Sequence, residues 1–140
     1  MKKFYFIIIL IAFIVTACDK VPMNGHLDGM WQLMAIQDNT AGSVSDVKTN
    51  RLYYSFQLHL VELNNNEAFA HFSHRGDSIV MYDWCYGNSD GNSVNVKMTD
   101  AAALNKFGLY ELRDSFKVEV LTSEKMQLRS RKATLSFRKF

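Results

Sequence analysis

Proline and cysteine are scarce in this chain, and neither sign of charge dominates. The single proline, Pro22, lies close to the N-terminus, so none interrupts the residues that follow, as hydrogen-bonded strands prefer. The two cysteines, Cys18 and Cys85, are too few for a fold built on a disulfide framework. Sixteen basic and 14 acidic residues give a formal charge of +2. This small excess gives no footprint for nucleic acid, which needs a strongly basic face.

A long hydrophobic run lies at the N-terminus. Lys2 and Lys3 precede an unbroken apolar stretch over residues 4–15, followed by Thr16 and Ala17. A basic start and an apolar run of this length are typical of a secretory signal, and the run is shorter than the roughly 20 residues of a membrane-spanning helix. We therefore expect residues 1–17 to be an export signal. Without its two lysines, 14 basic and 14 acidic residues remain, so the mature chain is neutral.

The signal ends in Val15-Thr16-Ala17-Cys18, which resembles the lipobox of bacterial lipoproteins. The resemblance implies that Cys18 receives lipid, that residues 18–27 form a short tether, and that the protein is anchored in the bacterial cell envelope. The alternative is an ordinary cleaved signal followed by a chance cysteine. Asp19 resembles an inner-membrane retention signal of some bacteria, which leaves open the choice between the outer membrane and the periplasmic face of the inner one.

Alternating apolar and polar residues predict an all-β domain over residues 28–140. The alternation is clearest in residues 52–63, where Tyr54 and Phe56 share one parity with Leu58 and Leu60, and we interpret this stretch as one long, curved strand. Strands are expected at residues 29–37, 51–63, 67–74, 77–84, 93–98, 109–112, 115–121, 125–130 and 133–139. The connectors are short, which favours an antiparallel meander of eight or nine strands. Closure into a barrel removes the exposed edges of such a sheet.

Two connections differ from the tight turns. Residues 38–50 form a long polar segment, which we expect to be a loop at the mouth of the barrel. Residues 100–107 predict a single short helix, with Thr99 or Asp100 as its N-cap and Gly108 at its end. This helix is expected to plug one end of the barrel.

The domain resembles the lipocalin-like domain found in many bacterial envelope lipoproteins. The resemblance rests on Gly29-Met30-Trp31, which matches the G-x-W signature of lipocalins. It also rests on the C-terminal pattern of Phe116-Lys117-Val118, Leu121-Thr122, Met126-Gln127-Leu128 and Leu135-Ser136-Phe137-Arg138. The resemblance implies that Trp31 closes the base of the barrel and that Arg138 covers its ring, with Arg131 as the second choice.

Five aromatic residues have parities that place them on one interior face: Tyr54, Phe56, Phe72, Tyr82 and Trp84. An apolar enclosure with a few polar groups is typical of a pocket for a small molecule. The first hypothesis is therefore a carrier that binds a small apolar or amphipathic ligand without catalysis. The alternative is a solid core in a protein-interaction module, an envelope inhibitor or accessory subunit, that makes contacts through residues 38–50 and 86–92.

The remaining candidate sites favour structural explanations. His71 and His74 are three apart on a predicted strand and face opposite sides, so we expect no metal site. Asn88, Asp90 and Asn92 are interpreted as a hairpin turn rather than a calcium loop.

A nucleophilic Cys85 would need His59 or His71 as its base, whereas a buried thiol that packs as a small apolar group needs neither. We expect no enzyme activity and no cofactor. Arg75-Gly76-Asp77 matches an adhesion tripeptide but is also ordinary turn chemistry, and the basic group Arg129, Arg131 and Lys132 is expected to be a solvated turn rather than a membrane contact.

Overall fold

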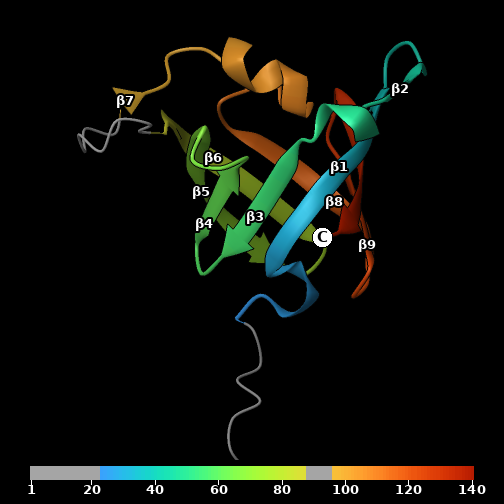
Figure 1. Ribbon diagram of the computed structural model, residues 1–140, viewed down its shortest axis with the longest axis horizontal. Coiled ribbons are helices and arrows are strands. Elements are labelled where there is room, and N and C mark those ends of the chain that lie inside the picture. The colour runs from blue at the N-terminus through green and yellow to red at the C-terminus, as the bar shows by residue number, and fades with distance from the viewer. Residues whose placement is uncertain (1–22, 88–95) are drawn as a thin grey trace, which may run out of the picture.

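A pairing between the first and last strands closes the sheet into a barrel. The computed structural model describes residues 23–87 and 96–140. Its strands are β1 (Gly29–Asp38), β2 (Val44–Asp46), β3 (Tyr53–Gln57), β4 (Leu60–Leu63), β5 (Ala68–Arg75), β6 (Ser78–Tyr86), β7 (Val96–Lys97), β8 (Asp114–Leu121), β9 (Lys125–Arg129) and β10 (Ala133–Lys139). The antiparallel order β10-β9-β8-β6-β5-β4-β3-β1 is closed by β1 against β10 (Figure 1), which confirms the predicted fold class.

Two short strands lie outside this ring of eight. β2 extends from the loop after β1 and pairs with the second half of that strand, while β7 pairs with the end of β6. Residues 38–50 therefore hold a strand and a helical turn, η2 (Lys48–Asn50), rather than the expected loop alone. Residues 109–112, expected to be a strand, belong to none, and residues 93–95 lie outside the described part of the chain.

The prediction of one long strand over residues 52–63 is wrong. Leu58 and His59 form a tight turn, and β3 and β4 pair with each other across it, with Gln57 opposite Leu60. Leu58 has φ of 55° in the left-handed region, where glycine or asparagine is usual. The turn reverses the chain, so Val61 and Leu63 point inward in β4 while Leu60 lies on the outer surface.

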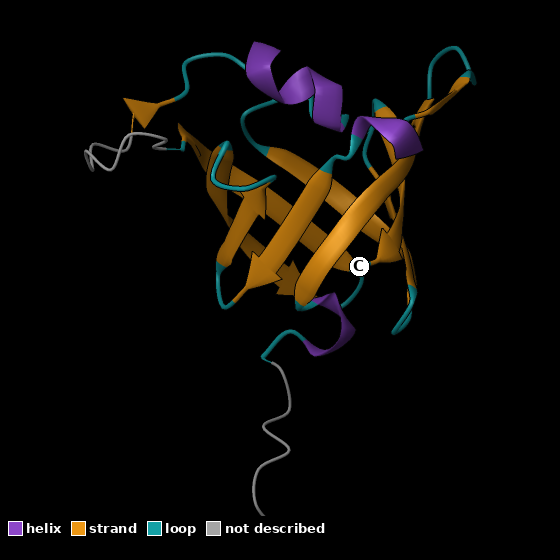
Figure 2. Cartoon of the chain, in the orientation of Figure 1, coloured by secondary structure: helices purple, strands orange, loops and turns teal. Residues whose placement is uncertain are grey.

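Helical turns lie at opposite ends of the barrel (Figure 2). η3 (Ala102–Phe107) occupies the position of the predicted helix, although it is a 3-10 helix, and buries Leu104 and Phe107 over one end. Gly108 ends it with φ of 80°, as the sequence predicted for the stop. At the other end, η1 (Gly25–Leu27) lies where a tether was expected, and its Leu27 is fully buried. No helix within the described residues has the length and apolar character needed to cross a membrane.

Candidate functional site

The interior of the barrel is filled by rings that contact one another. The Tyr54 ring centroid lies 6.2 Å from that of Phe56, 6.1 Å from that of Phe107 and 4.9 Å from that of Phe137. Phe72 meets Phe56 edge to face at 5.2 Å, within the range that aromatic pairs prefer. The phenol of Tyr54 donates a hydrogen bond of 2.7 Å to the carbonyl of Phe107, which ties η3 to the core.

Tyr82 does not belong to this interior group, so that part of the prediction is wrong. Its neighbour Asp83 has φ of 58°, and at this point the alternation along β6 shifts by one residue. As a result Met81 and Trp84 are buried while Tyr82 faces outward. On the outer surface the Tyr82 ring stacks on that of His71 at 5.9 Å.

The base of the barrel is built around Trp31, which has no exposed surface. Its indole nitrogen donates a hydrogen bond of 2.8 Å to the carbonyl of Leu27, which holds η1 against the barrel. The cation over its ring is Lys139, with the ammonium nitrogen 4.4 Å from the ring centroid. Burial lowers the pKa of this amine from its usual value, and the nearby Asp28 opposes the shift.

Lys139 thus takes the place that the family resemblance gave to Arg138, and this prediction is wrong by one residue. Register explains the difference, since Trp31 lies opposite Lys139 in the β1–β10 ladder. Arg138 points to the outer surface and donates a hydrogen bond of 2.8 Å to the side chain of Gln32, its own ladder partner. Arg131, the second choice, lies at the β9–β10 turn and pairs with Glu111.

The barrel wall is incomplete between β6 and β8. These strands pair only where Ser78–Met81 face Lys117–Asp114, and from Cys85 onward β6 pairs with β7 instead. A cleft of about 200 Å³ lies along this seam. Its lining residues are Tyr82, Asp83, Trp84, Lys97, Met98, Leu112 and Arg113.

The seam combines an apolar floor with two cations, Lys97 and Arg113, and one carboxylate, that of Asp83. Trp84 and Met98 are buried, and Leu112 packs against the core, so the floor of the cleft is apolar. The guanidinium of Arg113 lies over the Tyr82 ring at 5.1 Å. Sequence reasoning named Tyr82 and Trp84 but missed Met98 and Arg113, since only the course of the chain between β7 and β8 brings them together. Such a cleft suits a molecule with an apolar tail and an anionic head.

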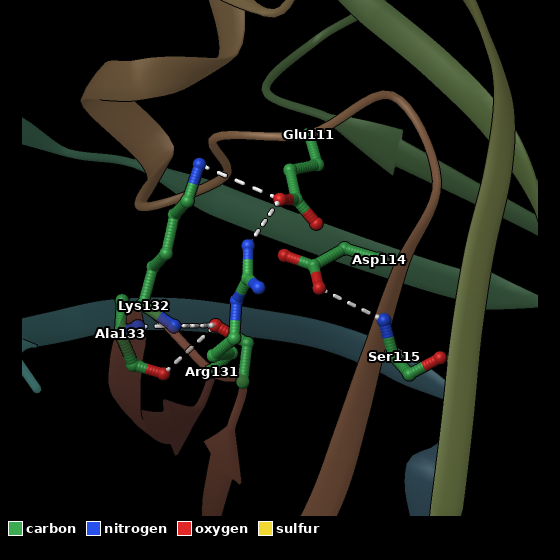
Figure 3. Close-up of polar contacts among 7 residues, drawn as sticks. Glu111, Asp114, Ser115, Arg131, Lys132 and Ala133 are labelled. Carbon is green, nitrogen blue, oxygen red and sulfur yellow. Dashed lines mark hydrogen bonds and ion pairs between the residues drawn. The ribbon is translucent and has the colours of Figure 1, made fainter.

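A polar cluster lies at the end of the barrel near η3 (Figure 3). The carboxylate of Glu111 accepts a hydrogen bond of 3.2 Å from Arg131 and lies 3.4 Å from the ammonium of Lys132. At the start of β8, the backbone amide of Ser115 donates a hydrogen bond of 2.9 Å to the carboxylate of Asp114. The Glu111 pairs are solvent-exposed, and each such pair contributes about 0–1 kcal/mol. These ion pairs connect the β9–β10 turn to the segment that precedes β8.

Asp114 is the unusual member of this cluster because it is only 8 % exposed. Burial and the charge of Glu111 raise the pKa of its carboxyl, while the Ser115 amide, Lys132 and Arg131 oppose the shift. The folded state therefore holds this proton more tightly than the unfolded state does. Stability falls as the pH rises from the ordinary carboxyl pKa through the raised value, and it stays lower above that window.

Asp114→Asn is therefore expected to stabilise the barrel at neutral pH, because the amide keeps an acceptor for Ser115 without a buried charge. The gain should shrink as the pH approaches 4, which thermal unfolding of both proteins across this range would measure. Glu124→Gln is the matched control, since it removes an exposed charge in the β8–β9 turn, away from Asp114, and is expected to cost less than about 1 kcal/mol. A variant less stable than the parent at neutral pH would contradict this account of Asp114.

The other residues weighed from the sequence do not line the seam. His71 and His74 lie on β5, with the His74 ring nitrogen 3.0 Å from the Gly76 carbonyl oxygen. Cys85 is a buried free thiol, and its nearest polar contact is the carbonyl of Asp83 at 3.8 Å. Within residues 23–87 and 96–140 no group of three or more potential ligands is arranged to hold a metal ion. Cys18 and residues 88–92 lie outside the described residues.

Comparisons with known proteins agree with this architecture. Residues 13–140 match the family model described as a lipocalin-like domain. A crystal structure of a lipocalin-like protein from Bacteroides uniformis is similar, with a TM-score of 0.60 and 24 % identity over 83 % of this chain and all of that one. An uncharacterized protein from Bacteroides eggerthii has a TM-score of 0.54 and 23 % identity over 81 % of this chain and 99 % of that one. No curated protein matches the chain. The family model covers most of the sequence, and the chain therefore belongs to the lipocalin-like domain family.

Proposed function

We propose that this protein is a lipid-anchored carrier of the bacterial cell envelope that binds a small, anionic amphipathic molecule at the β6–β8 seam without catalysis. The seam is the observation that carries the proposal. An apolar floor of Trp84, Met98 and Leu112 would receive the tail, and Arg113 and Lys97 would hold the head group. The filled interior supports binding at the wall rather than in a central cavity.

The anchor is supported by the sequence. The motif Val15-Thr16-Ala17-Cys18 ends a leader with a basic start and an apolar run. The first strand of the barrel, which carries Trp31, begins at Gly29, soon after this motif. Lipid on Cys18 would bury several acyl chains in the bilayer, and at about 0.8 kcal/mol for each methylene group the attachment is effectively permanent.

A titration with two detergents tests the seam. Dodecanoate and dodecyltrimethylammonium have the same tail and opposite head groups, and each is added below its micellar concentration to residues 19–140. Tryptophan fluorescence should respond to dodecanoate and much less to the cation, and Trp84→Phe should remove most of the response. Equal responses to both probes, or none to either, would exclude an anionic amphipathic ligand.

The effect of Arg113 provides the quantitative part of this test. Arg113→Glu is expected to weaken dodecanoate binding at least about tenfold, because a hydrogen bond to a charged group is worth about 1.5–3 kcal/mol. Lys48→Glu is the matched control: it changes an exposed cation on η2, away from the seam, and should leave binding unchanged.

The second candidate is a protein-interaction module, which the packed interior favours because no ligand is needed to fill it. Native mass spectrometry of residues 19–140 purified from the host separates the two. A recurrent small mass supports the carrier, whereas apo protein with a co-purifying polypeptide supports the module.

A further inference from the structure

The end of the barrel that carries η1 exposes apolar side chains that the core does not use. We define four of them as the base patch: Met23, Met30, Leu58 and Phe140. Their side chains are 63 %, 39 %, 57 % and 70 % exposed, respectively. Single exposed apolar residues are ordinary, but a group of them at one end of a molecule indicates a contact surface.

Hydrogen bonds join the segments that carry the base patch, and the Phe140 ring packs edge to face on Tyr53 at 5.1 Å. The backbone amide of Phe140 donates to the carbonyl of Met30 at 2.9 Å, so these two residues are neighbours. The side chain of Asn24, next to Met23, donates to the carbonyl of Leu58 at 2.9 Å. Lys139, next to Phe140, donates to the carbonyl of His26 at 3.1 Å and thereby links the two halves.

The conformation of Leu58 adds a local argument. Its φ of 55° is a conformation that branched residues rarely adopt, and a two-residue hairpin turn normally has glycine or asparagine there. The turn thus holds a strained leucine with more than half of its surface in solvent. Local strain of this kind persists where it serves a contact rather than the core.

Basic and acidic residues both lie at the end of the barrel that carries the base patch. Arg75 ends β5, Lys125 begins β9 and Arg138 lies near the end of β10, while the ammonium of Lys139 is held over the Trp31 ring. The acidic residues at this end are Asp28, Asp77 and Glu124, and the carboxylate of Asp28 is engaged by Asn24 through bonds of 3.1 and 2.6 Å. His26, His59 and His74 lie at the same end. Apolar tips among charged and polar residues suit the interface of a bilayer, where apolar side chains enter and charged ones stay at the head groups.

We propose that the base patch docks on the membrane surface, with Leu58 and Phe140 at the level of the lipid head groups. The inference rests on the proposed lipid anchor, because only four residues lie between Cys18 and Met23. The five extended steps from Cys18 to Met23 reach at most about 18 Å, so the lipid would hold this end of the barrel against the bilayer. In this orientation η3, at the opposite end of the barrel, faces away from the membrane. The seam, in the wall of the barrel, stays open to the periplasm.

The test uses the full chain, processed and lipidated in its host and reconstituted into vesicles of phosphatidylcholine with a minor fraction of phosphatidylglycerol. A fluorophore is attached at Leu58→Cys, with Ser45→Cys on the exposed strand β2 as the control away from the base patch. Brominated acyl chains should quench the probe at position 58 several-fold more than the probe at position 45. Adding Phe140→Asp to the Leu58→Cys protein should bring its quenching close to that of the control.

Mass spectrometry of the same preparation separates this inference from the anchor. Lipid on Cys18 with equal, weak quenching at both positions would overturn docking and leave the anchor intact. A Cys18 without lipid would overturn both, since the tether argument is then lost. A blue shift at position 58 without quenching by brominated lipid would place a protein on the base patch and also overturn the proposal.

Discussion

Trp31→Ala is expected to destabilise the barrel by about 3–5 kcal/mol, the range measured when a buried aromatic is truncated. Trp31 has no exposed surface, so the change would leave a cavity at the closed end. It would also remove the donor to Leu27 and the ring under Lys139. The free energy of unfolding from a urea titration of residues 19–140 measures this cost.

Met30→Ala is the control for this prediction. It is the adjacent residue on the same strand and points outward, so its loss is expected to change stability by less than about 0.5 kcal/mol. If the two variants unfolded at the same urea concentration, Trp31 would not be the residue that closes the base.

Tyr54→Ala is expected to cost a similar amount, about 3–5 kcal/mol, because Tyr54 is the ring on which the interior is assembled. Three other rings contact it, and it is fully buried. Thermal or chemical unfolding measures the loss. Because η3 is tied to this residue through the carbonyl of Phe107, amide exchange in residues 102–107 should also become faster.

Tyr54→Phe separates the hydroxyl from the ring. It keeps the packing and leaves the buried carbonyl of Phe107 without its donor, so it is expected to cost about 1–3 kcal/mol. Faster exchange in η3 should appear in both variants, while the larger loss of stability should appear only with alanine. Equal stability of the two variants would mean that the ring contacts contribute nothing.

The barrel was predictable from alternation and from the sparse breaks between strands. The interior positions Tyr54, Phe56 and Phe72 follow from parity, since each strand containing them is regular. The helix before the final strands was predictable too, because Gly108 marks its end. Local patterns suffice where a strand has no irregularity.

The wrong predictions arise where no residue type in the sequence indicates a turn, an irregularity or a pairing register. The turn at Leu58 and His59 contains no glycine, proline or asparagine, so nothing in the sequence indicates that the chain reverses there. Asp83 gives equally little warning of the irregularity that turns Tyr82 outward. The choice of Lys139 rather than Arg138 depends on the pairing register between two strands a hundred residues apart, which only the folded molecule shows.

Only part of the candidate site could be predicted from the sequence, for a related reason. Tyr82 and Trp84 were named as members of an interior group, yet they meet at a cleft in the wall. Met98 and Arg113 join them from segments without regular strand structure, one after β7 and one before β8. A site assembled from irregular segments leaves no periodic trace in the sequence.

The β1–β10 ladder also determines when the domain can fold. Trp31 pairs with Lys139, so the first strand of the ring waits for the last one before the sheet can close. A chain still emerging from the ribosome has an open sheet with an unpaired edge, and such long-range pairings form slowly. Closure therefore depends on residues 133–139, and their pairing with β1 is the step that commits the molecule to its native state.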